Sequence, residues 1–197
     1  MLGNPLGYNR VYVHLDGVFS ETAWWYGLGK GNCFVTNGPL LWVRANGRLP
    51  GAVFSAETSD SLALELDVQL TTIDRLIKLE VIQNGRVTGV IRCNGDRDKA
   101  HKLTVIISES GWFLVRGIAE TPKTFRFAST APFYVELGQE KWPISKASSR
   151  FFLDWVNERI ERVKDNITHQ SQQEEVLRFH EIARKLWQER VRQSNAD

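Results

Sequence analysis

The sequence predicts a mainly-β protein of the α+β class, built around an antiparallel β-sandwich. Three observations support this. Extended segments separated by turn residues fill residues 40–137, the apolar period changes to 3.6 after Pro143, and residues 10–36 alternate strand, helix and strand. We therefore expect three parts: a strand-helix-strand segment in residues 1–39, the sandwich in residues 40–145, and a helical pair in residues 146–197 packed on the rest.

The first part contains the elements of an α/β layer. Residues 10–15 (RVYVHL) are β-branched and aromatic, as a strand requires. Ser20 is a suitable N-cap for the short helix SETAWWYGLGKG, which its glycines weaken and end. Residues 32–36 form a second short strand. One strand-helix-strand unit cannot bury both faces of its strands, so this unit needs a larger partner.

The second part contains seven short extended candidates. Asn84-Gly85 is the strongest turn signal, because a two-residue type I′ turn needs positive φ at both positions, so residues 76–92 should form a hairpin. In residues 62–70, apolar and polar side chains alternate as in a half-buried strand. This spacing favours an immunoglobulin-like, two-sheet sandwich. The seven candidates are residues 40–45, 62–70, 76–83, 86–92, 102–108, 112–118 and 133–137.

The third part should be two antiparallel helices. The apolar stripe of the first helix consists of Phe152, Val156, Ile160 and Val163, widened by Phe151 and Trp155. Residues 171–174 (SQQE) match a capping box that would open the second helix. Its inward residues should be Val176, Phe179, Ala183, Leu186 and Trp187.

Composition excludes several classes of partner. Lys and Arg number 25 against 23 Asp and Glu, without a basic run, which argues against nucleic acid. No apolar segment reaches the roughly 18 residues that span a bilayer, so we expect a soluble globular protein without a membrane span. Cys33 and Cys93 lie in apolar, strand-like runs, where two readings stay open: buried thiols or a disulfide.

No catalytic or metal-binding motif is present. None of the four histidines has the spacing that metal ligands favour, and no P-loop, nucleophile elbow or dinucleotide fingerprint occurs. His14 is the most notable histidine, because it alternates with Tyr12 and Asp16 and the three could point the same way. We take His14 and Asp16 as candidate binding residues, against the alternative of a surface histidine beside a turn aspartate.

Two of the seven tryptophans are further candidates for binding. Trp112 and Trp142 fall at strand or loop ends, where an exposed indole could stack on a sugar ring. The competing interpretation assigns them to the core or to packing between domains. The sequence thus allows a free-standing module that binds a glycan or a protein.

An ordered set of motifs resembles the carboxy-terminal portion of the CehA/McbA family of metallohydrolases in the PHP superfamily. The set covers nearly the whole chain and begins with LGYNRVYVHLDG at 6–17, followed by the helix with its Trp24-Trp25 pair. The remaining motifs are CFVTNGPLL at 33–41, NGRLPG at 46–51, RFASTAPFYVEL at 126–137 and SRFFLDWVNERIERV at 149–163.

The resemblance implies that residues 10–37 are the last strand-helix-strand of a distorted α/β barrel whose metal-binding body lies outside this sequence. The family's paired-histidine motifs have no match here, so no catalytic or metal-binding residue is carried over. A divalent metal is expected only in the missing barrel. The chain would then be a non-catalytic accessory region whose partner is that barrel, although its exposed face could instead drive self-association into a dimer.

Overall fold

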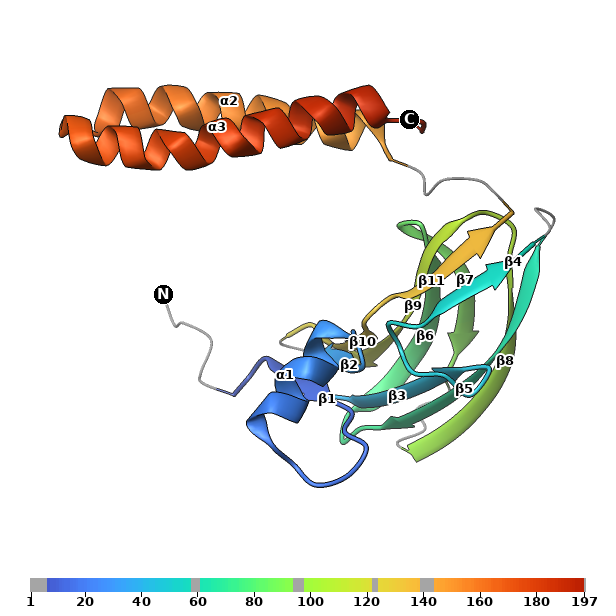
Figure 1. The fold of residues 1–197 in the computed structure, drawn as a ribbon. Coiled ribbons are helices and arrows are strands. Elements are labelled where there is room, and N and C mark those ends of the chain that lie inside the picture. Colours follow the sequence, from blue (N-terminus) through green and yellow to red (C-terminus); the bar gives the residue numbers. More distant parts are fainter. Residues whose placement is uncertain (1–6, 58–60, 94–97, 122–123, 139–143, 197) are drawn as a thin grey trace. The chain divides into compact units, whose positions relative to one another are not determined.

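The computed structural model describes residues 7–57, 61–93, 98–121, 124–138 and 144–196. It divides the chain into two compact units, residues 1–141 and 142–197, and each is described by itself (Figure 1). The first unit is mainly β and the second is a pair of helices. The predicted fold class, mainly β with a carboxy-terminal pair of helices, is therefore confirmed.

The described part of the first unit contains one helix and strands numbered β1 to β11. The helix and the strands before residue 60 are β1 (Arg10–Val13), α1 (Glu21–Gly29), β2 (Cys33–Thr36), β3 (Leu40–Ala45) and β4 (Val53–Ala56). The later strands are β5 (Leu62–Thr71), β6 (Arg75–Gln83), β7 (Arg86–Arg92), β8 (Asp98–Ile107), β9 (Gly111–Glu120), β10 (Arg126–Thr130) and β11 (Phe133–Leu137).

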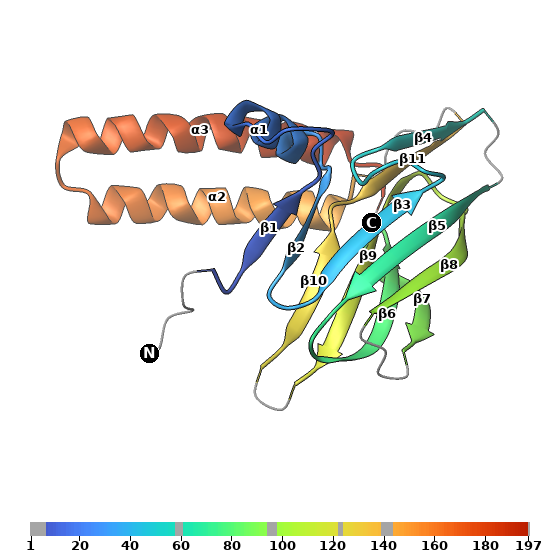
Figure 2. The same cartoon turned by 90° about the horizontal axis from the view of Figure 1, so that it is seen from below.

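These strands form two sheets. The larger has the order β1-β2-β10-β9-β11-β4, with β6 joining β9 to β7, and the smaller has the order β3-β5-β8 (Figure 2). One apolar cluster takes residues from both sheets, which is the arrangement of a β-sandwich. Its fully buried members include Leu41, Leu64, Leu66 and Leu70 from the smaller sheet and Phe113, Val115, Phe133 and Val135 from the larger.

Two local predictions in this sandwich are confirmed. β6 and β7 form the expected hairpin, with Asn84 and Gly85 at φ 45° and 82° in its turn. In β5 the residues Leu64, Leu66, Val68 and Leu70 are buried, while their neighbours in the strand are exposed. β4 and β10 were not among the predicted strands, and β4 pairs with β11 in parallel, so the sandwich is not wholly antiparallel.

The N-terminal segment differs from the expected α/β layer. Ser20 caps α1 as predicted, its Oγ accepting a hydrogen bond from the N–H of Ala23 at 3.1 Å. However, β1 and β2 are antiparallel, and β2 pairs in turn with β10. The segment therefore extends the larger sheet of the sandwich, and the predicted boundary between residues 39 and 40 lies inside one compact unit.

At residues 37–39 the chain passes from the larger sheet to the smaller one. The side chain of Asn37 holds the crossing to β10 by donating to the carbonyl of Phe125 at 2.8 Å and accepting from the N–H of Phe127 at 2.8 Å. The buried hydroxyl of Thr36 accepts from the N–H of Gly38 at 2.9 Å. Residues 37–39 therefore mark a change of sheet at the place where the sequence predicted the boundary between the first two parts.

The second unit contains α2 (Lys146–Asn166) and α3 (Gln170–Gln193). Ser145 caps α2 by accepting from the N–H of Ser148 at 3.1 Å. Two hydrogen bonds join the start of α2 to the segment after α3. The N–H of Ile144 donates to Oδ1 of Asn195 at 2.7 Å, and the N–H of Lys146 donates to the carbonyl of Ala196 at 2.7 Å.

The predicted capping box at the start of α3 is wrong. Ser171 lies inside the helix, and the cap position is His169, whose side chain makes no capping hydrogen bond. The amide of Gln173 instead donates to the carbonyls of Lys164 and Ile167, at 3.0 and 2.9 Å. It satisfies carbonyl groups near the end of α2, so this glutamine couples the two helices across the turn.

The predicted inward faces of the two helices are only partly correct. Ile160 and Val163 are buried, and the rings of Phe152 and Trp187 stack at 4.6 Å. By contrast, four residues expected to face inward or widen the stripe are exposed: Phe151, Trp155, Phe179 and Leu186.

The two cysteines are not joined by a disulfide. Cys33 is half-buried in β2, whereas Cys93 is buried and its thiol contacts the carbonyl of Ile91 at 3.8 Å.

Neither helix of the second unit, nor α1, combines the length and apolar character that a membrane-spanning helix requires.

Candidate binding site

A half-open cavity of about 580 Å³ lies where the edge strands of the two sheets approach each other. β1 with the two residues after it and β2 with the residue before it form one side, and β3 with the loop that follows it forms the other. Side chains from β5 and β10 complete it. The lining residues are Tyr12, Val13, His14, Leu15, Asn32, Cys33, Phe34, Leu41, Trp42, Val43, Arg44, Leu49, Pro50, Gln69 and Thr130.

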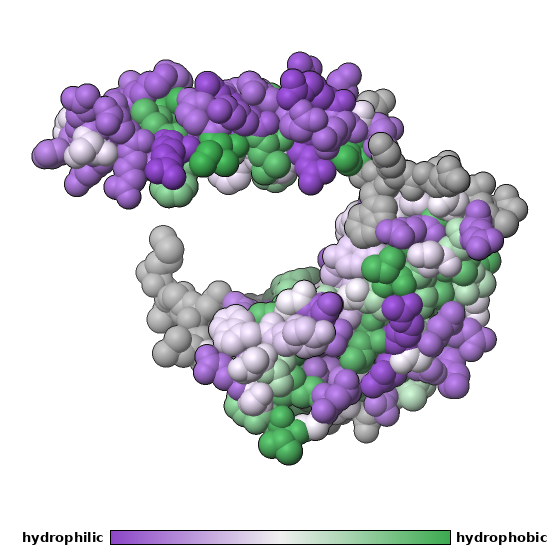
Figure 3. Space-filling model, in the orientation of Figure 1, coloured by the Kyte–Doolittle hydropathy of each residue, from purple (hydrophilic) through white to green (hydrophobic). Residues whose placement is uncertain are grey.

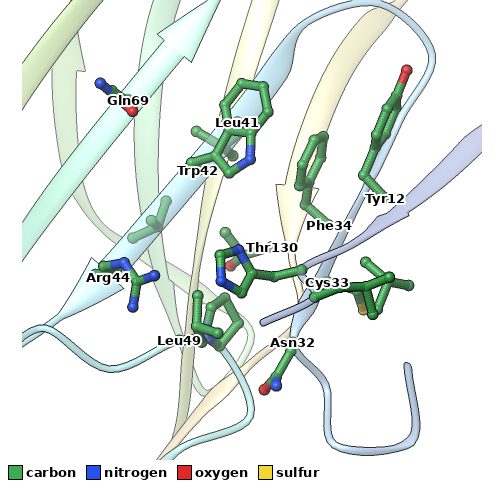
Figure 4. Close-up of a pocket in the computed structure, with 15 residues that line it drawn as sticks. Tyr12, Asn32, Cys33, Phe34, Leu41, Trp42, Arg44, Leu49, Gln69 and Thr130 are labelled. Carbon is green, nitrogen blue, oxygen red and sulfur yellow. The ribbon is translucent and has the colours of Figure 1, made fainter. Parts of the chain in front are cut away.

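Three aromatic rings form a wall of this cavity. Tyr12 and Phe34 are register partners across β1 and β2, and their rings stack with centroids 5.0 Å apart and planes 7° apart. Trp42 meets Phe34 edge-on at 5.5 Å (Figure 4). Tyr12 and Trp42 remain 37% and 41% exposed, so both present ring surface to solvent. Such a wall suits a flat or ring-shaped ligand, because aromatic faces stack on it.

Polar groups surround the aromatic wall. Nε2 of His14 lies 3.2 Å from Oδ1 of Asp16, and the guanidinium of Arg44 donates to the carbonyl of Gly47 at 3.0 Å. Asn32 and Gln69 add amide groups that both donate and accept hydrogen bonds. A ligand with several hydroxyl groups would find both donors and acceptors here.

The lining of the cavity contains a thiol, that of Cys33. Burial raises the pKa of the Cys33 thiol, which keeps it protonated and weakly nucleophilic. The lining residues that the structure describes include no carboxylate. In the described ranges, no three His, Cys, Asp or Glu side chains gather where they could share a metal ion. What the cavity offers a ligand is its aromatic wall and the hydrogen-bonding groups beside it.

A smaller cavity of about 230 Å³ adjoins the first. It shares Trp42, Arg44 and Gln69 with the first cavity, and its other lining residues lie on β5 and β8. Asp67 and Lys102 form an ion pair of 3.4 Å there. Trp42 thus borders two adjacent hollows, which would let an extended ligand run across the outer face of the β3-β5-β8 sheet.

The predicted site residues fall into three groups. His14 and Asp16 are together, and His14 lines the larger cavity with Tyr12. Trp112 lies at the start of β9, half-buried and not among the lining residues, with its backbone N–H donating to Oδ1 of Asn84 at 3.0 Å. Trp142 lies outside the described residues.

Sequence reasoning missed Phe34, Trp42 and Arg44 as site residues. A signal was present in LLWVRA, since Trp42 and Arg44 occupy the outward positions of a strand whose alternate residues Leu41 and Val43 are buried. A tryptophan on the solvent side of a sheet is a stronger sign of binding than one at a strand end.

A buried ion cluster lies outside this site. The carboxylate of Glu80 on β6, 4% exposed, accepts two hydrogen bonds from Arg116 at 2.7 and 2.9 Å and lies 2.6 Å from the ammonium of Lys78. Burial alone would raise the pKa of Glu80, but the hydrogen bonds and charges of Lys78 and Arg116 outweigh it and lower the pKa. The cluster joins β6 to β9 and has a structural role.

Comparison with known proteins found no matching family model and no matching curated protein. Among solved structures, part of the chain is similar to the fibronectin(III)-like modules of Clostridium thermocellum CbhA, with 11% identity over 48% of this chain and 96% of that one and a TM-score of 0.33. The CARDB domain of the PF1109 protein from Pyrococcus furiosus, in complex with di-metal ions, matches with 15% identity over 51% of this chain and 96% of that one and a TM-score of 0.31.

Proposed function

We propose that this chain is the non-catalytic, carboxy-terminal accessory region of a PHP-type metal-dependent hydrolase of the CehA/McbA family. Its sandwich, which we take to be immunoglobulin-like, would cover one edge of the metal-binding barrel and narrow the substrate entrance. The observation that carries this proposal is the open edge of β1 and the exposed apolar surface that follows it in the chain.

β1 supplies a strand edge for the missing body. Among the described strands it pairs only with β2, so its other edge presents unpaired backbone N–H and C=O groups. Such an edge invites a further strand, because each added strand satisfies those groups. The proposed barrel would supply that strand.

The segment after β1 supports the same junction. Val18 and Phe19 are 94% and 70% exposed, and Trp25 and Tyr26 on α1 are also more than half exposed. Four large apolar residues within nine positions are difficult to explain on an isolated unit, because soluble monomers seldom expose contiguous apolar patches. A neighbouring barrel would cover them.

The first test is the mass of the protein as its own organism makes it. We expect a species well above 22.5 kDa, carrying residues before Leu2, when the protein is captured with an antibody and measured by intact mass spectrometry. A species of 22.5 kDa would contradict the proposal, because the barrel would then be absent from the mature protein.

Metal content provides an independent check on the same proposal. The purified 197-residue chain should bind no stoichiometric zinc, manganese or iron, whereas the longer native species should bind such a metal. Stoichiometric metal in the short chain would contradict the accessory role.

A second candidate function is favoured by the aromatic cavity: a stand-alone β-sandwich module that binds a glycan. Tyr12, Phe34 and Trp42 would stack on sugar rings, while Arg44 and Gln69 would bond to their hydroxyl groups. This function needs no barrel, so it would become the leading one if the native protein has the mass of this chain alone.

Replacing Trp42 by alanine should raise the dissociation constant for a glycan about 10-fold. The indole ring would contribute about 1.4 kcal/mol by stacking on a sugar, and losing that energy changes the dissociation constant by this factor. The measurement is intrinsic tryptophan fluorescence during titration with glucose-, xylose- and N-acetylglucosamine-based hexasaccharides. Trp112→Ala is the matched control, because Trp112 does not line the cavity, and it should leave the affinity within about two-fold. The reverse pattern would place the site at Trp112.

A further inference from the structure

We infer that α2 and α3 form a self-association surface, and that a second copy of this chain covers it to complete a four-helix bundle. The surface consists of Phe151, Trp155, Phe179, Ile182 and Leu186 and is here called the apolar helical face. This inference does not depend on the proposed barrel, because no residue of the apolar helical face belongs to β1 or to α1.

The helical pair has little core of its own. α3 is 24 residues long, yet none of its residues is buried. On α2 only Ser149, Ile160 and Val163 are buried. Helices in water owe most of their stability to packing of an apolar face, so a pair with this small core needs a further surface.

The five residues of the apolar helical face are arranged to meet another pair of helices. Phe151 and Trp155 are four positions apart on α2, and Phe179, Ile182 and Leu186 follow a spacing of three and four on α3. The ring centroids of Phe151 and Trp155 lie 5.4 and 6.2 Å from that of Phe152. The ring of Phe152 in turn stacks on Trp187, the residue after Leu186. Figure 3 shows hydrophobic residues gathered along one long side of the pair.

The area of this face fits a dimer. Its five residues are between 52% and 64% exposed. Large apolar side chains offer about 150–250 Å² each, so together they present on the order of 500–600 Å² per chain. Two such faces bury about 1,000–1,200 Å² in total, the size at which specific interfaces begin.

A second copy fits this face because the two surfaces would be identical. A two-fold axis would place the α2-α3 pair of one copy against the α2-α3 pair of the other. Each helix would then pack along a helix of the second copy, as in a four-helix bundle. The aromatic residues Phe151, Trp155 and Phe179 then fill the interior, as they do in the centre of stable interfaces.

The test is sedimentation equilibrium of the full chain and of the Leu186→Glu variant. Wild type should sediment as a dimer of about twice 22.5 kDa at micromolar concentration. Leu186→Glu should raise the dimer dissociation constant at least about 100-fold, because it places a charge in the apolar interface. Phe179→Glu should act similarly, because Phe179 is 64% exposed and belongs to the same face. Far-UV circular dichroism should show no more helix in the two variants than in the wild type, because the monomer loses the packing that the second copy supplies.

Gln188→Glu is the matched control. It adds the same charge two positions further along α3, roughly 200° around the helix, at an exposed residue outside the apolar helical face. It should leave the dimer intact. A monomeric wild type, or a dimer that persists in Leu186→Glu and Phe179→Glu, would overturn the inference, and the second result would point to association through the first unit.

Discussion

Replacing Gly51 by alanine is expected to lower the free energy of unfolding by about 3 kcal/mol or more. Gly51 has φ +89°, a conformation that costs an L-residue about 1–2 kcal/mol. An added Cβ would also lie 1.8 Å from the carbonyl oxygen of Lys30, which a backbone atom cannot relieve without moving the end of α1. Urea denaturation followed by tryptophan fluorescence measures the change.

Gly47→Ala is the matched control for this substitution. Gly47 lies in the same connection between β3 and β4 and also has positive φ, +76°, but nothing lies within 4 Å of its added Cβ. It should therefore show only the conformational cost of about 1 kcal/mol. Equal losses in the two variants would show that the approach of Gly51 to Lys30 does not matter for stability.

Replacing Arg116 by leucine should destabilise the protein by about 2–3 kcal/mol at neutral pH. The substitution leaves the carboxylate of Glu80 buried with Lys78 as its remaining charged partner, and breaking a buried pair costs more than the pair contributes. Arg75→Leu is the control, because its 3.9 Å contact with Glu120 is exposed and should be worth less than about 0.5 kcal/mol. Comparable losses would contradict this role of the cluster.

The pH dependence of the Arg116→Leu effect has a definite sign. The pKa of Glu80 is lowered in the folded protein, so the ion cluster contributes fully above the ordinary glutamate pKa of about 4.3 and is lost as pH falls through the lowered value. The stability difference between wild type and Arg116→Leu should therefore be largest at neutral pH and shrink in acid. A difference that grows below about pH 4 would be inconsistent with this cause.

Much of the sandwich could be predicted because its signals are local. The alternation in residues 62–70 and the Asn84-Gly85 turn each act within a few positions. β4 and β10 escaped prediction because they are only four and five residues long, and β4 takes its partner β11 from far along the chain. The antiparallel pairing of β1 with β2 was missed for a related reason, since alternation of strand and helix does not specify strand direction.

The candidate site was harder to predict than the fold. His14 was found through its neighbours in the chain, but Phe34 and Trp42 meet across two different sheets. The sequence analysis gave Glu80 no role, because its register partner Arg116 comes from β9, 36 positions along the chain. Too many residues of α2 and α3 were expected to face inward. The 3.6-residue period identifies the apolar side of a helix, but it does not say which part of that side another element covers.

The long-range pairing of the larger sheet has a consequence for how the chain is synthesised. β2 pairs with β10, joining Thr36 to Ala128, and β4 pairs with β11, joining Phe54 to Val135. Neither partner has left the ribosome when β2 and β4 emerge, and at about 5–20 residues per second the delay lasts several seconds. During that time the early strands have unpaired edges, so the nascent chain is most prone to aggregation before β9 to β11 are complete.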